Sequence, residues 1–293
     1  MFCIYFKVNP LPATAKVLTW FAQFLARSMQ TVDSIRNYIS GVKLLHLFLG
    51  LPCEAFSCFE VKLALKGLAR LKPHRARQPM PITPKILLKM YQFLDMNSHI
   101  DIMWWALFTL TFFLMARKSN MVPVTPGEFD GKKQLTGRDI LIGKKVVMIH
   151  LKWSKTNQFG QRSLLIPLVS IPGSPLCPVT AVKKLRQVYP TGNSEPIFIL
   201  PKGQGYYPVT YKEMTDKLRS LLGLAGFNPK EYSSHSFRRG SATFAFAAGV
   251  PPSLIQLQGD WVSDSYLRYL EFKVRQRAMV GRQMRFAILG FDP

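Results

Sequence analysis

Acidic side chains are scarce in this sequence, and so are cysteine and histidine. Of its 293 residues, 16 are Asp or Glu, 4 are Cys and 5 are His, whereas 39 are Lys or Arg. The cysteines form no Cys-x-x-Cys pair and the histidines are scattered, which argues against a zinc site. The few carboxylates are not clustered as a two-metal nuclease requires. So few cysteines in a chain of this length favour a reducing compartment over a disulfide scaffold.

Long apolar runs are also missing. The longest uncharged run covers residues 102–116, which is shorter than the ~18 to 20 residues of a spanning helix. We interpret it as a buried core helix. The first ten residues contain no signal-peptide apolar region, and their abrupt Phe-Cys-Ile-Tyr-Phe start suggests that an upstream segment is absent. The sequence therefore predicts neither a membrane-spanning helix nor a secretory signal peptide.

The main positive feature is charge. The net charge is +23 and the sequence pI is about 10.1, with 48% hydrophobic residues and 12% aromatic residues. That apolar content supports a packed core, so most of the charge must lie on folded surface. A folded protein this basic is expected to bind a polyanion, either nucleic acid or an anionic membrane surface.

The order of patterns predicts a mainly α protein with a small antiparallel β-sheet (α+β). Residues 1–74 show helical apolar periodicity, with Thr31 as an N-cap. Residues 75–84 are a basic, proline-rich linker, which is either a solvated hinge or a strap along phosphates. At its end, Thr83 is expected to cap a new helix. Residues 85–293 form the second domain, in which residues 141–168 predict a β-hairpin or a three-stranded meander.

The clearest local pattern lies near the C-terminal end of the chain. Ser233 or Ser234 can cap a helix on which His235 and Arg238 share one face. A histidine and an arginine presented together, off the apolar face, suit an oxyanion such as a phosphate. The buried stripe of this helix is expected to consist of Phe237, Ser241, Phe244 and Ala248.

These residues resemble the second motif of the tyrosine recombinase family, the phage-integrase-like enzymes of DNA strand exchange. That motif is His-x-x-Arg at a helix start, an Ala-Gly-Val-like helix end, an Ile-x-x-Leu-like helix, and a tyrosine nine residues after a Gly-His or Gly-Trp step. The matching stretches are His235–Arg238, Ala247–Val250, Ile255–Leu257 and Gly259-Asp260, and the spacing selects Tyr269. Ala116–Ser119 is similar to the family's first arginine motif, and Lys155 to its hairpin lysine. Within the family, the sequence around Trp261 is most similar to that of the recombinases of Crypton and DIRS mobile elements.

The resemblance covers essentially the whole chain and implies a helical core-binding domain, a linker and a catalytic domain. It implies that Tyr269 attacks a phosphate to form a 3′-phosphotyrosyl bond, which conserves the phosphodiester energy. Arg117 and Arg238 clamp the nonbridging oxygens, and Lys155 protonates the leaving 5′ oxygen. His235 orients the phosphate or takes the tyrosine proton. No metal or other cofactor is implied.

Several assignments have a rival nearby. Tyr266 is the alternative nucleophile, Arg239 is the alternative to Arg238, and Lys152 is the alternative to Lys155. Two positions depart from the family pattern. Asn120 replaces an acidic residue that supports the first arginine, and Asp260 replaces His or Trp. The indole N–H of Trp261 is expected to fill that second role.

The leading hypothesis is therefore a site-specific recombinase or integrase of a mobile element, acting on double-stranded DNA as a homo-oligomer, expected to be a tetramer. Neither a membrane partner nor a small-molecule substrate is expected. Additional DNA contacts are assigned to Lys72, Arg75, Arg77 and Arg239. The alternatives are an inactive, domesticated DNA-binding derivative and, less favoured by length and motif order, a type IB topoisomerase. A eukaryotic source implies the nucleus, and any other source implies the cytoplasm, with the DNA.

Overall fold

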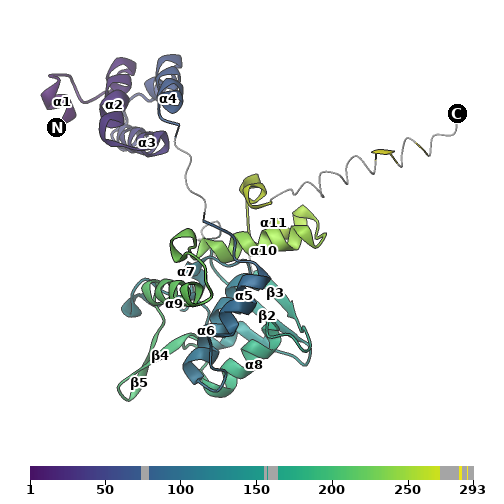
Figure 1. Cartoon of the computed structure of the whole chain (residues 1–293). Helices are drawn as coiled ribbons and strands as arrows, with labels where there is room; N and C mark the ends of the chain where they lie inside the picture. The colour runs from purple at the N-terminus through teal and green to yellow at the C-terminus, as the bar shows by residue number, and fades with distance from the viewer. Residues whose placement is uncertain (74–78, 155–156, 158–163, 271–283, 286–288, 290–293) are drawn as a thin grey trace. The chain divides into compact units, whose positions relative to one another are not determined.

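Two units make up the chain in the computed structural model, Met1–Gln78 and Pro79–Pro293 (Figure 1). The structure describes residues 1–73, 79–154, 157, 164–270, 284–285 and 289, without the side chains of Arg268 and Tyr269. Each unit is described on its own. The mainly helical fold with small antiparallel sheets confirms the predicted fold class.

The first unit is a helical bundle. Its elements are α1 (Phe2–Tyr5), α2 (Ala15–Ser28), α3 (Val32–Phe48), η1 (Glu54–Ser57) and α4 (Phe59–Leu71). The predicted cap is confirmed, since the Thr31 hydroxyl accepts the N–H of Ser34 at 3.1 Å. The fully buried His46 joins two loops, because one ring nitrogen accepts the N–H of Ala13 at 3.1 Å and the other donates to Pro52 O at 2.7 Å.

The second unit is built around α6 (His99–Phe113), whose residues 102–112 are all buried, as the uncharged run predicts. α6 packs against α8 (Pro178–Val188) and α10 (His235–Ala247) (Figure 1). The other helices are α5 (Pro84–Tyr91), α7 (Lys118–Met121), α9 (Tyr211–Leu224) and α11 (Pro252–Gln258), with short 3-10 turns η2 (Pro126–Glu128), η3 (Gly137–Asp139), η4 (Pro229–Glu231) and η5 (Asp264–Tyr269).

Two antiparallel sheets complete this unit. The first has the order β1 (Ile140–Ile142), β2 (Val146–Leu151), β3 (Leu164–Val169), which is the three-stranded meander among the two predicted alternatives. Its register pairs Ile149 with both Ile140 and Ile166. The second, β4 (Ile199–Lys202) with β5 (Gly205–Pro208), was not predicted. Within the described residues, no helix has the length and apolarity needed to cross a membrane.

The end of the sequence-predicted linker packs within the second unit. Met80 N–H donates to Glu231 O at 2.7 Å, Ile82 N–H donates to Ser236 O at 3.0 Å, and Ile82 is fully buried. Gly240 on α10 permits this approach, since a Cβ there would lie 1.8 Å from Ile82 O. The predicted cap follows directly, with the Thr83 hydroxyl accepting the N–H of Ile86 at 3.3 Å.

Candidate functional site

A pocket of about 310 Å³ lies where segments distant in sequence meet. The end of α6 and the start of α7 form one wall, the end of β2 a second, and α10 with α11 and the turn after it a third. Polar and charged groups from all three walls line it, including Arg117, Asn120, Ser154, Arg238 and Asp260. Of the catalytic residues predicted from the sequence, Arg117, Arg238 and Trp261 line this pocket together.

Arg238 is the most enclosed of these charges, with 4% of the residue exposed. Its Nη1 donates to Met115 O, and its Nη2 donates to Gly259 O at 2.5 Å. The guanidinium also lies over the Trp261 ring, 3.7 Å from the ring centre. Arg238 was predicted to lie off the apolar face of the helix, whereas the structure buries it, and carbonyl oxygens and an aromatic face stabilise its charge inside the protein.

The same helix departs from its predicted buried stripe. Phe237 and Ser241 are buried, whereas Phe244 is 50% exposed and Ala248 is also exposed. The apolar stripe is therefore shorter than predicted and ends after the first half of α10. The charged Arg238 is buried in the interior, where the apolar periodicity of a helix predicts hydrophobic side chains.

The backbone beside Arg238 adopts unusual conformations on both sides of the pocket. Met115 and Asp260 have φ angles of +48° and +50°, the left-handed region that non-glycine residues seldom adopt. Met115 supplies one carbonyl bonded by Arg238, and Asp260 follows Gly259, which supplies the other. Gly259 also leaves room for the Trp261 ring, because a Cβ there would lie 1.8 Å from it. Such conformations concentrate at functional sites, where the surroundings hold them in place.

Arg117 stands at the turn between α6 and α7 and is half-buried. Its backbone N–H donates to the side-chain oxygen of Asn120 at 3.2 Å, and the Asn120 amide donates to Trp153 O at 2.5 Å. Asn120 is 3% exposed. The amide thus joins the turn carrying Arg117 to the end of β2, which an acidic side chain without an N–H donor cannot do. Asn120, although it departs from the acidic residue of the family pattern, therefore still supports the turn that carries Arg117.

His235 begins α10 one turn before Arg238 and remains partly open to solvent. The N-cap residue of α10 is Ser234, whose side chain makes no capping hydrogen bond, whereas the Ser233 hydroxyl accepts the backbone N–H of His235 at 3.2 Å. Desolvation lowers the pKa of His235, and the positive charges of Arg238, Lys118 and Arg117 lower it further. The imidazole is consequently biased toward its neutral form, which can accept a proton.

Asp260 contacts the opposite wall of the pocket. Its Oδ2 accepts a hydrogen bond from the Ser154 hydroxyl, which comes from the residue just before Lys155. Asp260 therefore lies at the site, as a hydrogen-bond acceptor where the family pattern has a donor. Trp261, at 7% exposed, lies under Arg238, and this stacking indicates a supporting role for the ring.

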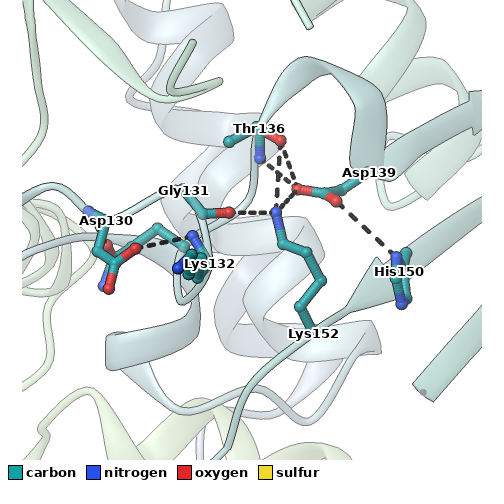
Figure 2. A network of polar contacts seen from close by, with 8 residues as sticks. Asp130, Gly131, Lys132, Thr136, Asp139, His150 and Lys152 are labelled. Carbon is teal, nitrogen blue, oxygen red and sulfur yellow. Dashed lines mark hydrogen bonds and ion pairs between the residues drawn. The ribbon is translucent and has the colours of Figure 1, made fainter. Parts of the chain in front are cut away.

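Lys152, the rival of Lys155, belongs to a different network (Figure 2). Its ammonium donates to Asp139 Oδ2 and to Gly131 O. Asp139 is 2% exposed and also accepts the N–H and hydroxyl of Thr136, at 2.7 Å and 2.6 Å. His150 Nδ1 lies 3.9 Å from its second oxygen. Lys152 is thus part of the structural support of β2 and does not line the pocket.

The two candidate tyrosines lie in η5. Tyr266 is 6% exposed and packs with Trp261, at 5.9 Å between ring centres, in a small cluster that includes Met115 and Ala242. Tyr266 therefore packs inside the second unit, beside Trp261. The backbone of Tyr269 ends η5, and its side chain lies outside the described part of the structure.

The remaining predicted site residues are those expected to contact DNA, together with Lys155. Lys72 Nζ donates to Ala26 O and to Met29 O at 2.9 Å, at the end of α2, which leaves one of its three N–H donors for a phosphate. Arg239 Nη1 donates to Pro79 O at 3.1 Å. Arg75, Arg77 and Lys155 lie outside the described residues. Where the structure describes the chain, no group of three or more His, Cys, Asp or Glu side chains is arranged to hold a metal ion.

Sequence reasoning missed two features of the pocket, the Ser154 side chain and the carbonyls of Met115 and Gly259. Every residue has a backbone carbonyl, so no sequence motif predicts which carbonyls face the pocket. A weak signal existed for Asp260, since Asp after Gly at a helix end is among the residues that tolerate a left-handed conformation.

Comparisons with known proteins identify the fold of the chain. A search of protein-family profiles gives no match. A curated integrase/recombinase XerD homolog from Selenomonas ruminantium is 22% identical over 283 residues, covering 92% of this chain and 76% of its own length. Two solved structures are similar in fold. The Tn1549 transposon integrase in complex with circular intermediate DNA has a TM-score of 0.59 and 14% identity, with 94% of this chain and 86% of that chain covered.

The second is a lambda integrase dimer bound to a COC′ core site, with a TM-score of 0.55 and 16% identity, covering 91% of this chain and 65% of that chain. At these identities the structural likeness establishes the fold. The chain therefore has the tyrosine recombinase fold, and its sequence is similar to that of the curated integrase/recombinase homolog.

Proposed function

We propose that this protein cleaves and rejoins DNA strands through a covalent bond between Tyr269 and a 3′ phosphate. The Tyr269 oxygen attacks phosphorus, the bond to the 5′ oxygen breaks, and the electron pair stays on that oxygen. The 5′ oxygen takes a proton from the Lys155 ammonium, and the tyrosine proton passes to His235. Attack by a 5′-hydroxyl on the phosphotyrosine reverses each transfer and reseals the strand.

The observation that carries this proposal is the convergence of Arg117 and Arg238 on one pocket, from elements about 120 residues apart. Two guanidinium groups supply paired N–H donors for the oxygens of a pentavalent phosphate. Arg238 is held in place by two carbonyls and the Trp261 ring, so it needs little reorganisation when charge develops.

The neutral bias of His235 supports its assignment as the acceptor of the tyrosine proton. Its pKa is lowered by desolvation and by the cations that bind the phosphate in this scheme. A histidine at this position is a base in the absence of substrate. The incoming phosphate adds negative charge beside it, which favours proton uptake as the reaction proceeds.

The biological setting is part of the same proposal. We assign the protein to the integration and recombination of a mobile element, because its motif wording resembles Crypton and DIRS recombinases and one fold neighbour is a transposon integrase. Double-stranded DNA is its partner, and a tetramer on DNA is the proposed assembly. A eukaryotic source places it in the nucleus, and any other source in the cytoplasm with the DNA.

The test is covalent capture without a known target sequence. Duplexes with a randomised segment and a nick at a fixed position are incubated with the protein in EDTA, and denatured protein–DNA adducts are isolated and sequenced. The nick releases a short fragment after cleavage and so prevents resealing. The proposal expects adducts with an enriched sequence for the wild type and for Tyr266→Phe, and none for Tyr269→Phe. Absence of adducts for the wild type contradicts the proposal.

A second candidate is a DNA-binding protein that has lost cleavage. The observation that favours it is the carboxylate of Asp260 at the pocket, where a negative charge opposes phosphate entry. This candidate predicts salt-dependent binding to duplex DNA without any adduct. The capture experiment, run beside a binding titration, separates the two functions.

A further inference from the structure

The Ser154 hydroxyl donates a hydrogen bond to Asp260, and this contact joins two walls of the pocket. Ser154 follows β2, and Asp260 lies in the turn between α11 and η5, 106 residues later. Ser154 is 7% exposed, so water competes little for its hydroxyl. A hydrogen bond to an ionised carboxylate in such a place is among the stronger ones in proteins.

Ser154 is itself held on both sides. Asn157 N–H donates to Ser154 O at 3.0 Å, and Asn157 is 4% exposed. The two residues between them in the sequence are Lys155 and Thr156. A buried, paired residue therefore stands at each end of the dipeptide that contains the proposed proton donor.

Asp260 is fixed by its backbone. Its φ is +50°, its N–H donates to Leu257 O at 3.1 Å, and the next N–H, of Trp261, donates to Gln256 O at 3.1 Å. The left-handed conformation is unfavourable for a residue with a Cβ, and the helix-end hydrogen bonds hold it. The carboxylate is thus presented from a rigid turn, the same turn whose Gly259 carbonyl binds Arg238.

We propose that the Ser154–Asp260 hydrogen bond positions the proton donor for the leaving 5′ oxygen. Ser154 and Asp260 are positioning residues, and the turn after α11 sets the location of the end of β2 relative to Arg238. The inference rests on the proposed function. It also explains why a carboxylate is tolerated among phosphate-binding cations, since its charge is engaged by the hydroxyl of the opposite wall.

The test compares two leaving groups on the duplex enriched by covalent capture. One duplex has the normal 5′ oxygen at the scissile phosphate, and the other has a bridging 5′ sulfur. A thiolate leaves without a proton because thiols are much stronger acids than alcohols. A defect in proton donation therefore slows cleavage of the oxygen duplex and spares the sulfur duplex, whereas a general structural defect slows both.

The variants separate the hydrogen bond from the charge. Ser154→Ala and Asp260→Ala remove the bond, and we expect cleavage of the oxygen duplex to fall roughly 10- to 100-fold, part of the ~10²- to 10⁴-fold effect of a general acid. Asp260→Asn removes the charge and retains an acceptor oxygen for the Ser154 hydroxyl, so it should lose less cleavage of the oxygen duplex than Asp260→Ala. Ser220→Ala, at an exposed position on α9, is the matched serine control.

On the sulfur duplex, all of these variants should cleave within about threefold of the wild type, as should Lys155→Ala. Equal defects of Ser154→Ala on both duplexes, or no defect on either, overturn the inference and leave the proposed function standing. A wild type that forms no adduct on either duplex overturns the proposed function, and the inference with it.

Discussion

The guanidinium carbon of Arg238 lies 3.7 Å from the centre of the Trp261 ring, and the two side chains come from segments separated by α11. The stacking geometry explains how a nearly buried arginine is held ready in the pocket. It also changes the role expected for Trp261, from a hydrogen-bond donor to the phosphate into an aromatic platform for the arginine that is proposed to bind the phosphate.

This role predicts that Trp261→Phe retains adduct formation within roughly fivefold of the wild type, because a phenyl ring preserves most of a cation–π contact. Trp261→Ala should reduce it far more and also lower stability by ~3 to 5 kcal/mol, the usual range for removing a buried Trp. Adduct yield and urea unfolding measure the two effects. A Trp261→Phe variant as inactive as Trp261→Ala would instead show that the indole N–H is required.

Arg238→Lys tests whether the fork geometry matters or the charge alone. Lys retains the charge and loses the paired donors to Met115 O and Gly259 O, so we expect adduct formation to fall ~10²- to 10³-fold. Arg239→Lys is the matched control. Arg239 is the next residue on α10, donates to Pro79 O and is not part of the pocket lining. Similar rates for the two variants contradict the assignment.

The lowered pKa of His235 gives a pH prediction with a definite sign. The unfolded chain binds the proton more tightly than the folded one, so the folded state loses stability as pH falls below about 6.5 toward the lower folded value. His235→Gln should reduce that acid-side loss. Thermal unfolding at pH 7 and pH 5 measures the difference. An equal loss in the variant and the wild type contradicts the prediction.

The same shift governs the rate of strand cleavage. A neutral His235 that accepts the tyrosine proton predicts that the acid limb of the pH profile of kcat/KM, which reports the DNA-free protein, lies below pH 6.5. Lys118→Gln removes one of the nearby positive charges and should move that limb to higher pH. A limb that stays in place in Lys118→Gln argues against His235 as its origin.

The buried pair of Asp139 and Lys152 is expected to support β2. Their side chains are 2% and 17% exposed, so Lys152→Met, which leaves Asp139 without its cation, should destabilise the second unit by ~3 to 5 kcal/mol. Lys133→Met breaks the exposed pair with Asp130, at 3.3 Å, and should change stability by less than about 1 kcal/mol. Denaturant unfolding compares them, and equal effects contradict the structural role of Lys152.

Local signals in the sequence were sufficient for most helices. Thr31 and Thr83 mark helix starts because a hydroxyl that accepts an early N–H is a short-range interaction. The strands β4 and β5 escaped prediction, since Ile199–Lys202 and Gly205–Pro208 contain prolines and lack alternation, and they form through pairing with each other.

Part of the pocket lining was predictable from the sequence, whereas its arrangement was not. The i, i+3 spacing selected Arg238 and the family resemblance selected Arg117, while the burial of Arg238 depends on carbonyls of Met115 and Gly259 that no side-chain pattern encodes. The Ser154–Asp260 contact spans 106 residues, and only the tertiary fold brings such partners together.

The most direct test of the account is to identify the residue joined to DNA. Trapped adducts are digested with protease and nuclease, and the peptide carrying a nucleotide is sequenced by mass spectrometry. The account predicts a phosphotyrosyl bond at Tyr269, formed in EDTA and lost in Tyr269→Phe. A nucleotide attached to Tyr266 or to any other residue, or no adduct from the wild-type protein on the randomised duplexes, contradicts it.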